Sequence, residues 1–303
     1  MIIKISIIRP DFGNNQDNNR FPQRGRELRK AFRGMYYKHQ KGDDTVSLIA
    51  GISVGSHAFI QVVTNQGPYY FSYPQSEYKS GRTLRIGGNT FSENGVKIRL
   101  EENGIKIRGK IKYTGLTPVK HDIMGPFRYL PMQCRHKITS LSHRLEGYLI
   151  INGKPIDFTE GTGYIEGDSG VSFPRSYVWV QCNDFPEKAC ITASVADIPF
   201  AGTRFRGCIC IVYINDTQYR LATYLGVRIL ALNERRIVLE QGRLKVEIEI
   251  DKGTGHILKA PENGEMTREI RERISCGARF RFIKDEEVIF EKYSKNASVE
   301  IVK

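Results

Sequence analysis

Three side chains that could carry out acid–base chemistry lie at alternate positions in one short segment. Residues 161–174 read GTGYIEGDSGVSFP and contain Tyr164, Glu166 and Asp168. The segment leads into an apolar run over residues 177–181, which holds the only tryptophan, Trp179. A carboxyl group at the edge of an apolar strand can have its pKa raised by desolvation and then serve as a proton donor. The same pattern is also typical of a turn capped by acidic side chains, which the residues alone favour.

Other candidate motifs are better explained by structure than by chemistry. Residues 51–55 match the G-x-S-x-G nucleophile elbow, which lies between a strand and a helix. Both flanks are strand-like here, so the segment predicts a hairpin loop. Cys208 and Cys210 alternate in an apolar run and are expected to pack in a core. The six histidines show neither H-x-H nor H-E-x-x-H spacing, so we expect no metal site.

The elements that must position these groups are strands. Val96, Ile98 and Leu100 alternate with charged residues, Asn103-Gly104 follows, and a second alternating run begins at Ile105. Two such runs around Asn-Gly are the strongest short-range signal for a β-hairpin. Further hairpin turns are expected at Asn152-Gly153, at Asn215-Asp216 and near Asp285-Glu286.

The length and the strand spacing predict an all-β protein with two antiparallel β-barrels in tandem and few short helices. A chain of 303 residues corresponds to about two domains. Strands with one apolar and one charged face suit barrels with an apolar interior. We expect an irregular basic arm over residues 1–30, a first barrel over residues 31–160 and a second over residues 161–303. The turn-rich stretch between 150 and 175 contains the boundary.

The formal net charge of +13 indicates an anionic partner or a well-solvated surface. Nucleic acid is not the expected partner, because no helix-turn-helix pattern or interleaving of aromatic and basic residues is present. A peripheral contact with an anionic membrane surface is also consistent with this charge. The sequence has no run near the roughly 18 apolar residues of a membrane span. Its first ten residues do not resemble a signal peptide, so we expect a cytoplasmic protein with reduced cysteines.

Residues 161–174 resemble a signature of the tocopherol cyclase-like family, G-x-G-Y-x-E-x-D-W-G-x-S-F-P followed by an aromatic strand that ends in glutamine. Residues 34–62, 125–147 and 193–224 contain further stretches similar to the family. The sequence departs from the family pattern at two positions: Ser169 and Met35 stand where the relatives carry tryptophan. Arg33 stands where they carry an acid.

The resemblance implies a pair of lipocalin-like barrels, related to carotenoid hydratase-type proteins. It also implies chemistry without a metal or cofactor on apolar isoprenoid or polyketide molecules. In tocopherol cyclase, a phenol adds across a prenyl double bond after that bond is protonated. For this chain we expect Asp168 to be the acid, supported by Glu166 and Tyr164, in an apolar barrel mouth. The side chains expected to contact the substrate are Tyr37, His136, His143, Arg175, Trp179 and Asn183.

Two functions therefore follow from the sequence. The first is an intramolecular lyase or isomerase that cyclises or isomerises a prenyl quinol or another apolar, lipid-like small molecule. The alternative is a carrier or sensor that binds such a molecule without chemistry, which the replacement of both tryptophans favours. His136 and His143 are second candidates for the acid, although a single histidine more often has a structural role.

Overall fold

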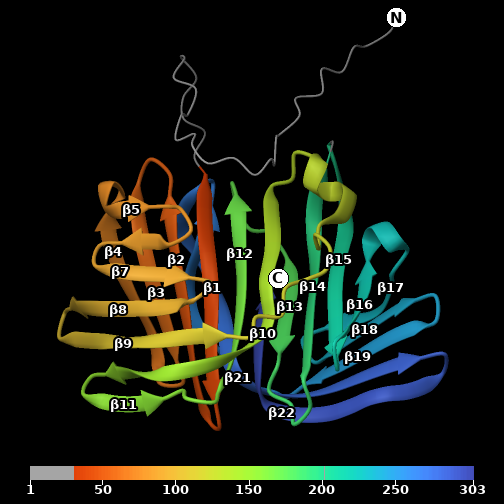
Figure 1. The fold of residues 1–303 in the computed structure, drawn as a ribbon. Coiled ribbons are helices and arrows are strands. Elements are labelled where there is room, and N and C mark those ends of the chain that lie inside the picture. Colours follow the sequence, from red (N-terminus) through yellow and green to blue (C-terminus); the bar gives the residue numbers. More distant parts are fainter. Residues whose placement is uncertain (1–30, 201) are drawn as a thin grey trace, which may run out of the picture.

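The protein consists of two large antiparallel sheets that lie side by side (Figure 1). A computed structural model describes residues 31–200 and 202–303, so the basic arm expected over residues 1–30 lies outside the described residues. Within that part of the chain, the helical elements are the three short turns η1 (Gln75–Glu77), η2 (Gly125–Tyr129) and η3 (Thr223–Leu225). The all-β prediction is confirmed.

The first sheet has twelve strands in the order β4-β3-β2-β1-β12-β10-β9-β8-β7-β6-β5, with β11 paired to β10. Its strands are β1 (Phe32–Lys41), β2 (Asp44–Ser53), β3 (His57–Thr64), β4 (Gly67–Pro74), β5 (Tyr78–Lys79), β6 (Leu84–Ile86), β7 (Asn89–Ser92), β8 (Gly95–Glu102), β9 (Ile105–Thr114), β10 (Cys134–Ile151), β11 (Lys154–Asp157) and β12 (Thr162–Gly170).

The second sheet has ten strands in the order β16-β15-β14-β13-β22-β21-β19-β18-β17, with β20 paired to β21. Its strands are β13 (Tyr177–Cys182), β14 (Ala189–Phe200), β15 (Thr203–Ile214), β16 (Thr217–Ala222), β17 (Arg228–Asn233), β18 (Arg236–Gln241), β19 (Leu244–Ile250), β20 (His256–Glu262), β21 (Glu265–Lys284) and β22 (Glu287–Val302).

The predicted hairpin turns form where the sequence places them. Asn103 and Gly104 both adopt positive φ, 51° and 79°, between β8 and β9. A two-residue loop with two positive φ angles matches the twist of the flanking strands, which is why Asn-Gly is favoured there. The turns at 152–153, 215–216 and 285–286 have the same left-handed backbone. Residues 51–55 lie in the β2–β3 hairpin, as predicted.

The change from the first sheet to the second comes after β12. This strand pairs with β1 and β10 of the first sheet, and the next strand, β13, belongs to the second. The chain crosses from the first sheet to the second over residues 171–176.

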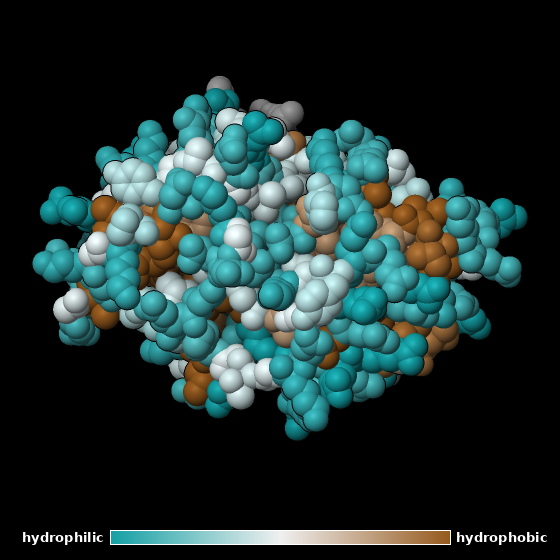
Figure 2. Space-filling model, turned by 90° about the horizontal axis from the view of Figure 1, so that it is seen from below, coloured by the Kyte–Doolittle hydropathy of each residue, from teal (hydrophilic) through white to brown (hydrophobic). Residues whose placement is uncertain are grey.

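Each sheet encloses a core of its own. Leu48, Ile60 and Ile111 belong to the core of the first sheet, and Val180 and Phe280 to that of the second. Cys208 and Cys210 pack in the second core, as predicted. A third apolar cluster contains residues of both sheets. The view from below shows a mainly hydrophilic surface, with hydrophobic residues gathered toward both sides (Figure 2).

Buried polar contacts join the two sheets. The Tyr36 hydroxyl donates a hydrogen bond of 2.6 Å to Glu272 Oε1. Lys38 Nζ, on the same face of β1, donates to Gln181 Oε1 at 3.1 Å and to the Asn296 carbonyl at 2.8 Å. Since buried polar groups must be paired, these contacts fix how the sheets meet. Among the described residues, no helix has the length and apolarity needed to span a membrane.

Candidate active site

Strand alternation brings the three signature residues to one face of β12. Tyr164, Glu166 and Asp168 are two residues apart, so their side chains point to the same side of the sheet. The register of the neighbouring strands places His136 of β10 opposite Asp168 and Tyr36 of β1 opposite Glu166. The signature therefore forms a strand of the first sheet, and its polar face is directed at the second sheet.

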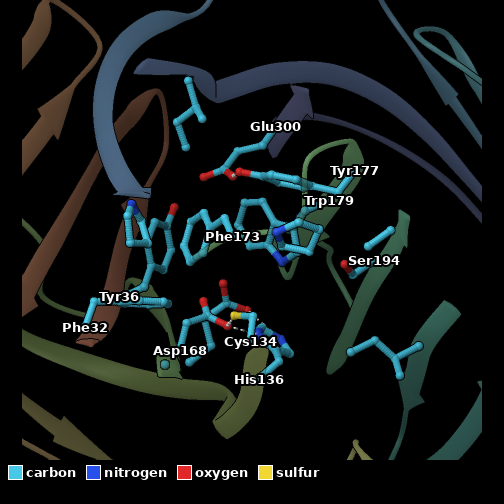
Figure 3. Close-up of a pocket in the computed structure, with 18 of the residues that line it drawn as sticks. Phe32, Tyr36, Cys134, His136, Asp168, Phe173, Tyr177, Trp179, Ser194 and Glu300 are labelled. Carbon is cyan, nitrogen blue, oxygen red and sulfur yellow. Dashed lines mark hydrogen bonds and ion pairs between the residues drawn. The ribbon is translucent and has the colours of Figure 1, made fainter. Parts of the chain in front are cut away.

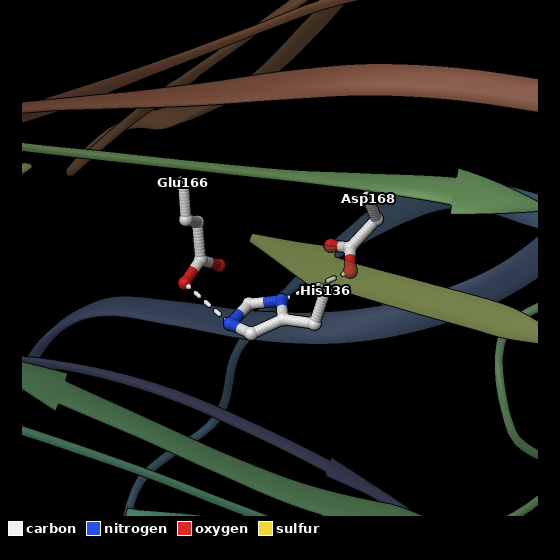
Figure 4. Close-up of side chains that lie close together, drawn as sticks. All are labelled: His136, Glu166 and Asp168. Carbon is white, nitrogen blue, oxygen red and sulfur yellow. Dashed lines mark hydrogen bonds and ion pairs between the residues drawn. The ribbon is translucent and has the colours of Figure 1, made fainter. Parts of the chain in front are cut away.

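The imidazole of His136 lies between two carboxylates (Figure 4). Its Nδ1 is 2.9 Å from Asp168 Oδ1, and its Nε2 is 3.4 Å from Glu166 Oε2. Burial opposes a charge on the ring, but Asp168 and Glu166 outweigh this effect and raise the pKa of His136 to about 9. The ring is therefore an imidazolium at neutral pH, with an acidic side chain at each nitrogen.

Glu166 has the properties of a proton donor. Its carboxylate accepts a hydrogen bond of 2.6 Å from the Tyr164 hydroxyl. Burial, and to a lesser degree Asp168, raises the pKa of Glu166 to about 7 against the lowering effect of His136. A group whose pKa lies near the ambient pH is well suited to general acid–base catalysis, because both of its protonation states are populated.

A cavity of about 170 Å³ opens beside these groups (Figure 3). It lies between the two sheets, and Tyr36 and Phe32 of the first sheet line it together with Tyr177 and Trp179 of the second. An engineered cavity of about 150 Å³ admits benzene, so this space admits a ring or a short prenyl segment. The barrel mouth expected from the sequence is not where the site lies, because apolar side chains fill the interior of each sheet.

Two features of the cavity wall had no signal in the sequence. Glu300 of β22 faces the cavity and accepts a hydrogen bond of 2.6 Å from the Tyr177 hydroxyl. Burial and the nearby Glu272 raise the pKa of Glu300 well above its usual value. The indole N–H of Trp179 lies close enough to Glu166 to lower its pKa, yet it makes no hydrogen bond with the described residues. It is a free donor beside the acid.

Four of the nine residues predicted for the site line the cavity: His136, Glu166, Asp168 and Trp179. Tyr164 is fully buried behind Glu166. The other four, Tyr37, His143, Arg175 and Asn183, lie elsewhere.

Tyr37 points into the first core, where its ring stacks on Tyr113. His143 also packs on Tyr113, and burial lowers its pKa to about 3. Asn183 donates its amide to the Gly163 carbonyl, and Arg175 is exposed. Strand register turns Tyr37 and His143 to other faces, whereas Arg175 and Asn183 lie in loops outside the strands.

Ser169 and Met35, which stand where the relatives carry tryptophan, lie differently with respect to the cavity. Ser169 alternates with Asp168 on β12, so its side chain lies on the opposite face and does not line the cavity. Met35 lines the cavity and packs against the first core. Only the change at Met35 therefore alters the cavity wall.

His136, Glu166 and Asp168 could also converge on a divalent cation, since their ligand atoms lie within 4.8 Å of one another. One imidazole and two carboxylates are a common ligand set for transition metals. Here each ring nitrogen already faces a carboxylate oxygen. A metal would have to displace one of these contacts, so the present geometry suits a bound proton better than a bound metal.

Comparison with solved structures identifies the fold. Kievitone hydratase from Nectria haematococca matches 91% of this chain over 89% of its own, with a TM-score of 0.54 and 12% sequence identity. CghA with Sch210972 matches 90% of this chain over 89% of its own, with a TM-score of 0.54 and 8% identity. No curated protein sequence matches the chain.

Comparison with family models gives the relationship that the signature predicts. The model described as tocopherol cyclase-like matches residues 104–302, which is more than half of the chain. This range includes His136, Glu166, Asp168, Trp179 and Glu300, all of which line the cavity. The chain belongs to the tocopherol cyclase-like family.

Proposed function

We propose that this protein is an enzyme that protonates a carbon–carbon double bond of an apolar, prenylated small molecule held between the two sheets. The observation that carries the proposal is a buried carboxyl group, Glu166, that opens on an apolar cavity and has its pKa raised to about 7. Membership of the tocopherol cyclase-like family supports it, as does a similar fold in a protein named as a hydratase.

In the proposed reaction, Glu166 rather than Asp168 is the acid. Asp168 is more exposed and forms the shorter contact with His136, so it holds the imidazolium in place. Glu166 is almost fully buried, and its neutral form is favoured by the apolar wall. Its carboxylic acid transfers the proton to one carbon of the double bond, which leaves a carbocation on the other carbon and a carboxylate on Glu166.

The carbocation is then captured by an oxygen. A phenol of the same molecule closes a ring, whereas a water molecule gives a hydrated product. In either case the attacking oxygen loses its proton to the Glu166 carboxylate, which restores the acid. The aromatic rings of Tyr36 and Trp179, in edge contact at 5.6 Å, line the space where positive charge develops. Aromatic faces attract cations, most strongly when water is excluded.

Glu166→Gln tests this role directly. The substitution keeps the shape of the side chain and removes the proton, so turnover of a geranyl hydroquinone should fall by at least about 100-fold, the usual share of a general acid. Product is measured by chromatography and mass spectrometry. Glu247→Gln is the matched control, since Glu247 is a largely buried carboxylate of the second sheet away from the cavity.

The alternative of a non-catalytic carrier predicts a different outcome. Stoichiometric binding of the hydroquinone without product in the unchanged protein would favour the carrier. Full turnover in a correctly folded Glu166→Gln variant would remove Glu166 from the acid role.

A further inference from the structure

The outward face of β8 and β9 carries basic side chains directly opposite one another. Lys97 lies across from Lys110, and Arg99 lies across from Arg108. All four side chains are exposed. Opposite residues on one face of an antiparallel pair have Cβ atoms about 4.5–5.5 Å apart, and like charges there destabilise the sheet. This repulsion lowers the stability of the sheet, so we infer that the basic side chains serve a function other than folding.

The row extends across five strands, and its basic residues lie on three of them, β6, β8 and β9. Arg85 of β6 lies opposite Thr90, Thr90 lies opposite Lys97, and Lys110 lies opposite Tyr148 of β10. Tyr148 is 53% exposed, so its ring lies at the surface at the end of the row. We call this surface the basic face. It consists of Arg85, Lys97, Arg99, Arg108, Lys110 and Tyr148.

Among the residues that the structure describes, the five cations of the basic face form no salt bridge with a carboxylate. The neighbouring acids Glu101 and Glu146 pair with other lysines, at 2.7 Å from Lys106 and 3.3 Å from Lys112. The face therefore keeps an excess of positive charge, although Arg99 lies close enough to Glu101 to help lower the pKa of that carboxyl.

The second sheet shows that the same chain can pair its surface charges. Arg236 lies across from Glu249, and Glu247 lies across from Arg281. Arg281 Nη1 is 3.4 Å from Glu247 Oε2, and Arg279 Nη1 is 3.3 Å from Glu291 Oε1. Like charges directly opposite one another are thus a feature of β8 and β9, whereas these strands of the second sheet place opposite charges across from each other.

We propose that the basic face binds the surface of an anionic phospholipid membrane. Rows of cations on adjacent strands present charge over an area, which suits a layer of lipid headgroups. Tyrosine at the end of the row is a side chain typical of the membrane–water interface. Single-stranded nucleic acid is bound through several stacked aromatic rings, and here one ring lies at the edge. The choice of a membrane also rests on the proposed function, since an apolar substrate would partition into lipid.

Vesicle binding by the full chain tests the basic face without any substrate. The probes are vesicles of phosphatidylcholine with phosphatidylserine and vesicles of phosphatidylcholine alone, in low and high salt. We expect binding to the anionic vesicles only, with an affinity that falls as salt increases. An attraction of roughly 1 kcal/mol for each basic residue corresponds to about a fivefold change in affinity. The double variant Arg99→Gln/Lys110→Gln should therefore bind about 25-fold more weakly.

The control is the double variant Arg236→Gln/Arg279→Gln, which removes the same charge from the second sheet. Its affinity for anionic vesicles should stay within about twofold of the unchanged protein, because these residues lie outside the basic face. The two variants also differ in stability: removal of Arg99 and Lys110 should raise the urea midpoint, whereas removal of Arg236 and Arg279 should lower it.

Three results would overturn the proposal. One is the absence of binding to anionic vesicles in low salt. Another is an equal loss of binding in both double variants, which would indicate net charge alone. The third is binding of a short single-stranded RNA that depends on Arg99 and Lys110 when vesicle binding does not. None of these results depends on turnover, so failure of the membrane contact is distinguishable from failure of the catalytic proposal.

Discussion

At the scale of single residues, the site is defined by one imidazolium between two carboxylates. The pKa of His136, about 9, lies above its usual 6.5, so its contribution to stability is complete below pH 6.5 and is lost as the pH rises through 9. The pKa of Glu166, about 7, lies above its usual 4.5, so the folded state favours its protonated form. Near neutral pH the site therefore holds a mobile proton on Glu166 and a fixed one on His136.

The pH dependence of the proposed reaction follows from these values. We expect kcat/KM to fall as the pH rises through about 7, because Glu166 then loses the proton that it donates. In His136→Asn, the positive charge that lowers the pKa of Glu166 is absent, so the fall should move to higher pH. Carbon-13 NMR of a labelled Glu166 carboxyl measures the same pKa without turnover. An unchanged value in the variant would contradict this electrostatic link.

The free indole donor gives a second prediction at this scale. Trp179→Phe keeps most of the ring and removes the N–H, so affinity for an oxygen-bearing ligand should fall about 5- to 10-fold, the value of one hydrogen bond. Stability should be unchanged or slightly higher, because an unpaired buried donor is removed. Ligand titration by calorimetry and thermal unfolding measure the two effects. Unchanged affinity would show that the ligand does not use this donor.

At the scale of elements, the close approach of β10 and β12 explains a glycine of the signature. A Cβ on Gly163 would overlap Nε2 of His143, whose ring is packed on Tyr113 at 4.5 Å. We expect Gly163→Ala to lower the free energy of unfolding by about 1–3 kcal/mol, as overpacking of a core does. Gly34→Ala on β1 is the control, since a Cβ there has no neighbour within 4 Å. Urea denaturation of the two variants should separate them, and equal stabilities would contradict the packing argument.

The sequence predicts where strands and turns lie better than it predicts which side of a strand faces the cavity. The Asn-Gly turns are local, so they could be placed from the residues alone. The choice of Tyr37 over Tyr36 shows the limit: both lie in β1, but a shift of one residue exchanges the two faces of a strand. Tyr36 lines the cavity, and Tyr37 lies in the core.

Partners from distant strands could not be predicted either. Tyr36 and Glu272 are 236 residues apart, and Glu300 reaches the cavity from the last strand. No local pattern marks these acids, because each occupies an ordinary position of an alternating strand. Their role depends on how the two sheets pack, which is a property of the whole chain.

At the scale of the whole molecule, Tyr36 has two roles. It lines the cavity between the two sheets, and its hydroxyl joins the sheets through a hydrogen bond to Glu272. Tyr36→Phe removes the hydroxyl that joins the sheets and leaves Glu272 without a described hydrogen-bond donor. We expect a loss of about 1–3 kcal/mol in the free energy of unfolding, the cost of an unsatisfied buried group. Tyr70→Phe is the control, because its bond to His57 lies within the first sheet and is partly exposed. Equal losses, measured in urea, would contradict a special role for the contact.

The position of the acid on one wall of the cavity has a stereochemical consequence. A flat double bond that lies between the sheets turns one face toward Glu166 of the first sheet and the other toward Glu300 of the second. A proton that Glu166 donates reaches only one of these faces. The phenol or water oxygen then attacks a carbocation that the cavity holds in a single orientation. The new carbon centre would then form with a single handedness, fixed by which sheet carries the donor.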